Sequence, residues 1–511
     1  MTTAHSLSHR ASRADQLRRT GTLALTVLAA AVLAGCAALG NSHSTQTMTD
    51  ASTLASPQTF TNEHGQWPSQ DWVDQFHDAQ LRALVDEAIQ GNPNLQVAFG
   101  RLAASRAMAD ATRAALYPGV DFEGSLVRQR FSETDLFEGT PLAGSWQNQS
   151  RLQLGFSWDL DFWGKNRDAL EAALSDDRAM EAETQAARLV LTTSVARSYN
   201  RLAALYAQRD VAERAIAQRR DLTDLSRQRL AAGLDTQVET TQARGTVAAA
   251  QTDLQRVDEE IALARNQIAA LLGKGPDRGL QIAKPTLLAN ATPQLPDDLT
   301  IGLIGRRPDL VAARWRVEAS SKDITVAKKE FLPDVKLTAF AGVASLDPSN
   351  LLMSMSRTFG VGPSLTLPIF QGGRLRANLK GKYAQYDIAA ASYNQTLVDA
   401  LRETADTVTS IRSVDQQIQT QREALDLAEH AYSLATMRYK AGLGTQLTVL
   451  NAESNVLQQR RLATDLQARR LDLQIGLMKA LGGGYEEEAA ARTGTPHDAG
   501  KPAGTAQAAQ G

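Results

Sequence analysis

The sequence has few of the residues that mark enzymes and disulfide-stabilised proteins. Cys36 is the only cysteine in 511 residues, so the chain can form no internal disulfide bond. Only His77 and His430 lie between the low-complexity segments at the two ends, and their spacing fits no metal site. Neither a phosphate-binding loop nor a nucleophile elbow is found. We therefore expect no catalytic residue, no metal ion and no cofactor.

Charge and hydropathy argue against two further classes. The formal net charge is −2, which favours neither nucleic acid nor an acidic substrate as a partner. Beyond residue 66, no apolar run approaches the roughly 20 residues that a membrane-spanning helix needs. We therefore expect no membrane-spanning helix after the N-terminal region.

The N-terminus has the pattern of a secretion signal that ends at a lipidation site. Basic residues at 18 and 19 precede an apolar run over residues 23–33, which leads into the lipobox sequence LAGC. We predict a signal peptide over residues 1–35, cleavage between Gly35 and Cys36, and a diacylglyceryl group on the Cys36 thiol. The alternatives are an ordinary cleaved signal or a transmembrane anchor, for which the run is short. Residue 37 is alanine and not aspartate, which resemblance to enteric lipoproteins would identify as an inner-membrane retention signal, so this resemblance implies the outer membrane.

An internal duplication organises the rest of the chain. Prolines in two similar segments lie 215 positions apart, and three pairs of glycines further along lie 209 apart. The first copy therefore has six extra residues between Pro118 and Gly164. The matching pairs are Pro93 and Pro308, Pro118 and Pro333, Gly164 and Gly373, Gly233 and Gly442, and Gly273 and Gly482.

Composition places the boundaries around the two copies. Residues 36–66 are rich in Ser, Thr, Ala and Gln without an apolar period, and we predict a lipidated tether there. We predict that residues 67–290 and 291–484 are the two repeats, each with a helix, a β-hairpin and long helices. Residues 485–511 have a similar low-complexity composition and are expected to be a disordered tail.

Each copy begins with a helical pattern, over about 78–116 or 303–331, that ends at a proline. The period then changes to two, most clearly after Arg151, which predicts four strands in two hairpins. Strands of about 10 to 12 residues can cross a hydrocarbon layer when tilted. A soluble sheet packed on helices is the alternative. The alternating apolar residues are Leu152, Leu154, Phe156, Trp158, Leu160 and Phe162.

Very long helical patterns follow the strands in both copies. They run over 166–231 and 374–440, and each is followed, after a glycine, by a second helix over 236–272 or 445–481. A helix of about 65 residues would be roughly 100 Å long, which no globular domain requires. Many alanines allow these helices to pack closely.

Four strands are too few to close a barrel in one chain. An open sheet edge in lipid leaves backbone groups unpaired at several kcal/mol each, so the sheet must close, and the smallest known barrels have about eight strands. A trimer would supply 12 strands. The polar strand residues would then face a water-filled lumen and the apolar ones lipid. The acidic members of the polar set are Asp121, Glu123, Asp159 and Asp161.

The sequence resembles the TolC and OprM family of outer-membrane efflux channels, and within it the lipidated, NodT-type branch that serves resistance-nodulation-division pumps. The resemblance covers nearly the whole mature chain. It implies a mixed α and β fold: a trimeric 12-stranded outer-membrane β-barrel continued by a long periplasmic α-helical barrel. Its carriers are the lipobox, NPNL and RRPDL, YP and LP before the strands, DLDFWGKNR and LPIFQGGRLR after them, and the turns AGLDTQ and AGLGTQ.

The two turns reverse the chain in helical hairpins. Gly233 and Gly442 are suited to the left-handed cap that ends a helix, and Thr236 and Thr445 to the N-cap of the next helix. Chain reversal by itself is sufficient to explain the glycines. The family resemblance implies, in addition, that these tips close the periplasmic end of the channel and open by helix movement on contact with an adaptor.

The resemblance carries over to the gate only in part. Tyr439 matches a tyrosine that bonds across to the neighbouring hairpin, and Glu239 matches its acidic partner, with a solvated helix-end charge as the alternative for Glu239. Leu447 matches a constricting leucine of the lipidated branch. Thr448 and Asn451 stand where relatives often have aspartates, and Gly444 stands where TolC has arginine. We therefore expect a weaker cation preference and a gate closed mainly by packing around Leu447.

The expected function is passive export of drugs or other small molecules from the periplasm or a pump to the outside. The partners implied by the resemblance are two further copies of the chain, a periplasmic adaptor protein, an inner-membrane resistance-nodulation-division pump and outer-membrane lipid. A type I protein-secretion channel is one alternative. A non-pore envelope coiled-coil lipoprotein is another, but it would not explain the strands.

Overall fold

The computed structural model describes residues 43–54, 65–134, 138–287, 296 and 299–487. The predicted signal peptide, its Gly35–Cys36 cleavage site and most of the predicted tail lie outside these residues. The chain forms two compact units. We call Met1–Met48, Arg101–Met180 and Ala313–Tyr393 the strand unit, and Thr49–Gly100, Glu181–Ala312 and Asn394–Gly511 the helical unit.

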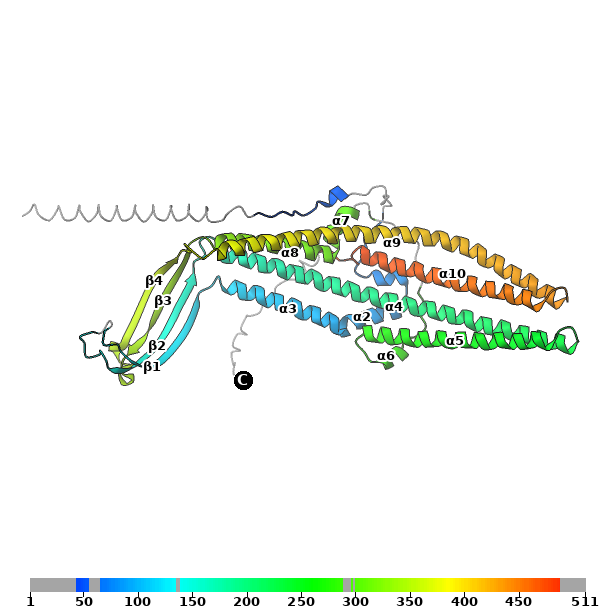
Figure 1. Cartoon of the computed structure of the whole chain (residues 1–511), viewed down its shortest axis with the longest axis horizontal. Coiled ribbons are helices and arrows are strands. Elements are labelled where there is room, and N and C mark those ends of the chain that lie inside the picture. Colours follow the sequence, from blue (N-terminus) through cyan, green and yellow to red (C-terminus); the bar gives the residue numbers. More distant parts are fainter. Residues whose placement is uncertain (1–42, 55–64, 135–137, 288–295, 297–298, 488–511) are drawn as a thin grey trace, which may run out of the picture. The chain divides into compact units, whose positions relative to one another are not determined.

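The strand unit holds the four predicted strands in one antiparallel sheet (Figure 1). They are β1 (Gly119–Arg130), β2 (Trp146–Asp159), β3 (Asp334–Ser345) and β4 (Arg357–Thr366), in the order β1-β2-β3-β4. The prediction of two hairpins is confirmed, and β2 begins earlier than the alternation after Arg151 indicates.

One face of this sheet is apolar and open to solvent in the protomer. The register places Phe122 opposite Leu154, and Phe156 opposite Ala339. Phe359 on β4 is 83% exposed. Large apolar side chains exposed along a whole sheet face require another apolar phase or partner to cover them. This face therefore has the character of a lipid-facing surface.

The helical part of the strand unit has its own small core and a set of ion pairs. Phe331, at the end of the segment before β3, packs with Ile324, Ala327, Leu375 and Leu379. Around this cluster, the Lys329 ammonium lies 2.6 Å from Asp168, and the Lys382 ammonium lies 2.6 Å from Asp323.

The long helices match the duplication residue for residue. Helices α4 (Lys165–Ala231) and α9 (Arg374–Lys440) each have 67 residues, and α5 (Gln237–Leu271) and α10 (Gln446–Ala480) each have 35. In each pair of equivalent helices, α4 with α9 and α5 with α10, both the first and the last residues lie 209 positions apart. Figure 1 shows α4 with α5, and α9 with α10, as two hairpins. None of the helices among the described residues is long and apolar enough to cross a membrane.

The predicted helical segments over 78–116 and 303–331 are confirmed as helical, but each is divided into two helices. The structure has α2 (Ala79–Gly91) and α3 (Pro93–Ala114) in the first copy, and α7 (Leu299–Arg306) and α8 (Pro308–Lys329) in the second. The break falls in front of a proline in both copies, because proline lacks the N–H of a continuous helix and its ring disfavours helical backbone at the preceding residue.

The core of the helical unit surrounds Tyr199, which is fully buried. Its hydroxyl donates to Asp78 over 2.9 Å, and burial raises the pKa of the Tyr199 hydroxyl. Asp78 also caps α2 by accepting from the backbone of Gln80 and Leu81. The short elements of the chain are η1 (Ala51–Leu54), η2 (Trp72–Phe76), α6 (Pro276–Leu280), η3 (Pro348–Asn350) and η4 (Ser354–Ser356).

Part of the predicted tether is bound to the fold. In the strand unit, the Asp387 carboxylate on α9 accepts hydrogen bonds from the backbone N–H groups of Thr45 and Gln46 and from the Thr45 hydroxyl. Asn394 accepts from the Thr49 N–H in the helical unit. Residues 45–49 are therefore bonded to α9 at these positions and do not form a free linker.

Candidate functional site

The two hairpin tips have the local structure that their sequences predict. Gly233 and Gly442 have φ angles of +73° and +76°, in the left-handed region that favours glycine. The following residue donates its N–H back to the carbonyl of Arg229 in the first tip and of Arg438 in the second. These bonds satisfy carbonyls that the helix end would otherwise leave unpaired.

Threonine caps the next helix at both tips. The Thr236 hydroxyl accepts from the Val238 N–H at 3.1 Å, and the Glu239 carboxylate accepts from the Thr236 N–H at 2.8 Å, which completes a capping box. Thr445 caps α10 through the Thr448 N–H. At the first tip, the hydrogen bonds that the Glu239 carboxylate accepts from Thr236 lower the pKa of Glu239.

The predicted partner of Tyr439 is wrong. Its hydroxyl donates a hydrogen bond to Asp235 and not to Glu239, which is engaged in the capping box. Asp235 lies in the turn between α4 and α5, so this bond joins the first hairpin tip to α9 of the second. The alternative reading of Glu239, a charge at a helix end, agrees with the structure.

Arg229 completes this contact, which we call the tip latch (Arg229, Asp235 and Tyr439). Its guanidinium lies 3.1 Å from Asp235, donates to the Tyr439 carbonyl over 2.9 Å, and sits 4.5 Å from the centroid of the Tyr439 ring. Tyr439 is 1% exposed. Burial and the bond to Asp235 raise the pKa of Tyr439 to about 12.

The repeat comparison contains a signal for the residues that sequence reasoning missed. Asp235 has Gly444 at the equivalent position of the second copy, and Tyr439 has Leu230 at the equivalent position of the first. Both residues of the Tyr439–Asp235 hydrogen bond thus depart from the duplication, whereas Arg229 is matched by Arg438. Such departures at a turn that is otherwise repeated indicate a contact made once per chain.

The other predicted tip residues line one side of α10. Leu447 is 58% exposed, Thr448 and Asn451 are exposed, and spacings of three and four place them on neighbouring positions of the helix surface. Val449 points the other way and is buried with Tyr439 and Leu222. The tip therefore divides into a buried latch and an exposed Leu447 face.

A second contact joins the hairpins further from the tips. The Arg219 guanidinium on α4 lies 3.1 Å from the Glu453 carboxylate on α10 and donates to the Thr246 carbonyl over 2.9 Å. Glu453 is 2% exposed. Its burial raises the pKa of the Glu453 carboxyl, although the nearby Arg219 charge acts in the opposite direction.

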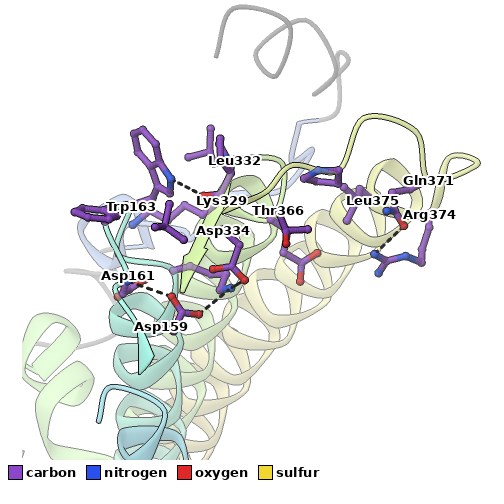
Figure 2. Close-up of a pocket in the computed structure, with 16 residues that line it drawn as sticks. Asp159, Asp161, Trp163, Lys329, Leu332, Asp334, Thr366, Gln371, Arg374 and Leu375 are labelled. Carbon is purple, nitrogen blue, oxygen red and sulfur yellow. Dashed lines mark hydrogen bonds and ion pairs between the residues drawn. The ribbon is translucent and has the colours of Figure 1, made fainter. Parts of the chain in front are cut away.

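The strand-to-helix junction explains the motif DLDFWGKNR (Figure 2). Asp161, predicted to face the lumen from a strand, lies beyond the end of β2, and its carboxylate accepts from the backbone of Asn166 and Arg167 at the start of α4. The Trp163 indole donates to the Pro333 carbonyl over 2.8 Å. Lys165 lies 3.7 Å from both Asp159 and Asp334.

A cavity of about 290 Å³ at this junction is lined by both carboxylates and cations, among them Asp159, Lys165 and Asp334. Within the described part of the chain, no group of three or more His, Cys, Asp or Glu side chains is placed to hold a metal ion. Hydrogen bonds and ion pairs at the junction thus connect the end of β2 and the start of α4 with the segment before β3.

A sheet with an exposed apolar face, joined to two very long helical hairpins, defines one protomer of an oligomeric membrane channel. The profile of the family described as "Outer membrane efflux protein" matches residues 84–274 and 302–483, one match in each repeat. The chain belongs to this family.

Similar proteins of known role and solved structures support the same family assignment. The chain is 39% identical over 367 residues to the fusaric acid resistance protein FusA of Burkholderia cepacia, which covers 70% of the chain and 69% of FusA. It is 32% identical over 465 residues to the multidrug resistance outer membrane protein MdtQ of Escherichia coli O157:H7, covering 89% and 96%. The crystal structure of VceC from Vibrio cholerae matches with a TM-score of 0.78 at 38% identity, covering 82% of this chain and 100% of VceC.

The protein is therefore an outer-membrane channel subunit of a tripartite efflux system. Three protomers form a β-barrel of four strands each, continued by an α-helical barrel that extends into the periplasm. Channels of this family work with adaptor proteins and resistance-nodulation-division pumps. The family is one of conduits and not of enzymes.

Proposed function

We propose that this channel is a passive, lipid-anchored conduit for small organic compounds whose periplasmic end is held closed by the tip latch. The names of the relatives FusA and MdtQ support organic toxicants and drugs as cargo. The observation that carries the proposal is the bond between Tyr439 and Asp235, because it ties together the two hairpins that must separate for the tips to open.

The latch has the chemistry of a switch. Hydrogen bonds in which one partner is ionised are shorter and stronger than hydrogen bonds between neutral groups. The Arg229 and Asp235 side chains that form the latch are only 12% and 7% exposed. Opening would expose these groups to water, which replaces the lost bonds, so the closed state is favoured only modestly. An adaptor that binds the separated tips better than the latched ones would shift the equilibrium.

Leu447 supplies the second part of the closed gate. In a trimer, the exposed Leu447 faces would meet around the channel axis and narrow it with apolar side chains. Thr448 and Asn451 carry no charge, so an acidic ring does not add to this constriction. The remaining proposed features are the Cys36 lipid, the signal over 1–35, the repeats over 67–290 and 291–484, and the tail over 485–511.

Single-channel conductance of the purified trimer in a planar bilayer tests the gate. Tyr439→Phe removes the latch hydroxyl and Leu447→Ala removes the constriction, and each should raise conductance above that of the parent channel. Tyr432→Phe is the matched control, because it removes a hydroxyl from the same helix without touching Asp235. Equal conductance in all four proteins would contradict the proposal.

The lipid anchor needs a separate test. Mass spectrometry of the mature protein should find an N-terminal peptide that begins at Cys36 and carries acyl chains. Cys36→Ser should abolish that mass increment. A mature chain that begins elsewhere would contradict the anchor but leave the latch untouched.

A further inference from the structure

The sheet has two outer edges that the described chain leaves without a partner strand. In the order β1-β2-β3-β4, the outer edge of β1 and the outer edge of β4 remain open. An open edge in hydrocarbon is costly because each unpaired backbone group has no water to bond. In the trimer, β4 of one protomer must therefore pair with β1 of the next, at a junction that we call the seam.

The two hairpins of the chain share one register. Gly119 on β1 pairs with Ser157 on β2, and Asp334 on β3 pairs with Thr366 on β4. Moving 215 positions from the first residue of one pair and 209 from the second gives the other pair, which are the offsets of the duplication. The hairpins are therefore equivalent residue for residue.

Equivalent hairpins imply equivalent junctions. The chain itself contains one junction between its hairpins, where Ser157 on β2 pairs with Thr338 on β3 and Gly155 pairs with Phe340. The seam is the same kind of junction, with β4 in the place of β2 and β1 of the next protomer in the place of β3. A closed barrel in which every junction has the same shift has one strand tilt throughout, which avoids local distortion.

We propose that the seam repeats the β2–β3 register, so that Ser364 pairs with Ser125 of the partner subunit. In the same register, Thr366 lies opposite the partner subunit's Glu123 and Leu365 opposite Gly124 of the partner subunit. The eight residues from Phe359 to Thr366 then find partners, all of them within β1. The seam thus uses eight of the ten residues of β4.

The chemistry of the two edges fits this register. Thr366 and Ser364 meet polar partners on the lumen face, whereas Leu365 and Pro363 meet Gly124 and Leu126 of the partner subunit on the apolar face. A register slip of one residue would place the polar side chains of one strand beside the apolar side chains of the other. Polar side chains would then face lipid, which is energetically unfavourable. Slips of two residues keep the faces and are the alternatives to be tested.

The register also decides which charges stand alone in the lumen. At the junction within the chain, Asp159 lies opposite Lys336. At the seam, the position equivalent to Asp159 is Pro368, so Asp121 of the partner subunit has no cation opposite it. Glu123 of the partner subunit faces the Thr366 hydroxyl instead. The seams are therefore the acidic stripes of the lumen.

Engineered cysteine pairs test the register directly. Ser125→Cys with Ser364→Cys should form a disulfide between protomers under mild oxidation, because directly opposed strand residues have the Cα separation that a disulfide needs. The matched controls are Glu123→Cys with Ser364→Cys and Val127→Cys with Ser364→Cys, which report the two-residue slips. All variants keep the natural Cys36, and each single variant measures background cross-linking.

The proposal predicts that the 125/364 pair links fastest, as covalent dimers and trimers on denaturing gels. Faster linking of either control pair, equal linking of all three, or no linking in a trimer that light scattering shows to be intact would each overturn it. The outward pair Gly124→Cys with Leu365→Cys gives a second reading on the lipid face and should link in the same register.

A charge test covers the case in which cysteine variants fail to assemble. Thr366→Lys should raise the temperature at which the trimer dissociates, since the new ammonium lies opposite a carboxylate of the partner subunit. This gain should disappear when Glu123→Gln is added and largely remain when Asp121→Asn is added. The reverse pattern would assign the slipped register, and no gain in any background would also count against the proposed seam.

Discussion

Asn92 and Arg307 occupy equivalent positions in the two repeats, and each donates a hydrogen bond to the equivalent backbone carbonyl. The Asn92 amide reaches the Leu271 carbonyl at 2.8 Å, and the Arg307 guanidinium reaches the Ala480 carbonyl at 3.2 Å. Both carbonyls lie at the C-terminal end of the returning helix, where no intrahelical N–H is available. Two different side chains thus form equivalent bonds, which connect the end of α5 to the start of α3 and the end of α10 to the start of α8.

The two residues should differ in what their removal costs. Asn92→Ala removes the N-cap of α3, for which about 1 kcal/mol is typical. Arg307 is buried and also pairs with Asp309 and Glu403, so Arg307→Ala should cost about 3 kcal/mol, the scale for breaking a buried ion pair. Helix circular dichroism in urea measures both, and equal losses would contradict this ranking.

Two glycines should be intolerant of any side chain. A Cβ at Gly273 would lie 2.2 Å from the Gly91 carbonyl oxygen, and one at Gly482 would lie 1.9 Å from that of Arg306, and both glycines have positive φ. Alanine at either site should lower the midpoint of thermal unfolding. Gly245, inside α5 with open space around it, is the control: alanine there should stabilise by about 0.5–1 kcal/mol.

The latch assignment predicts different effects for substitutions of two acids only four residues apart. Asp235→Asn weakens the contact with Arg229 and Tyr439, so channel conductance should rise. Glu239→Gln should leave conductance near that of the parent, because glutamine can keep the capping box with Thr236. Conductance that rises only in the Glu239 variant would restore Glu239 as the gate's acid.

The ion selectivity of the tip is open to a gain-of-function test. Since Thr448 and Asn451 are uncharged, Thr448→Asp would place three carboxylates around the axis of a trimer and should increase cation preference, measured as a reversal potential in a salt gradient. Thr448→Asn is the neutral control of matched size. An aspartate variant with unchanged selectivity would mean that position 448 does not line the pore.

Acid should affect the helical unit through two glutamates with opposite signs. Burial raises the pKa of Glu453, so the folded state binds its proton more tightly and this carboxyl favours folding as the pH falls towards 4.5. The Glu403 carboxyl is partly desolvated, but Lys479 and Arg307 lower its pKa overall, so its contribution is lost as the pH falls below 4.5.

Removing each group should therefore change the acid response in opposite directions. Between pH 7 and 4.5, the thermal midpoint of Glu453→Gln should fall more steeply than that of the parent. Below pH 4.5, the midpoint of Glu403→Gln should fall less steeply. Parallel midpoint curves for the three proteins would show that neither shift is coupled to unfolding.

Much of the fold follows from local sequence codes. Period-two alternation gave the four strands, glycine followed by threonine gave both hairpin tips, and the offsets of 215 and 209 gave two copies with matching helix ends. These features depend on residues close in sequence, where backbone preference and side-chain period decide the outcome. The break before Pro93 was also visible in principle, since proline begins helices more readily than it continues them.

The contacts of the candidate site were not accessible in the same way. Nothing near Tyr439 in the sequence distinguishes Asp235 from Glu239, because both lie in the other repeat and both are acidic. The structure separates them: Glu239 is one turn into α5 and reaches its own N-cap, whereas Asp235 lies in the turn that faces α9. Asp161 was likewise assigned to a strand face although it caps α4.

The sequence by itself determined the duplicated architecture, the strand and helix content and the membership of the chain in a channel family. These features depend on the spacing of apolar residues within short segments and on motifs in a fixed order. Tertiary structure alone decided which acid holds Tyr439, which side chain joins each repeat's ends and how the strands are registered. Those outcomes depend on packing distances between segments about 200 residues apart, and no local preference encodes such distances.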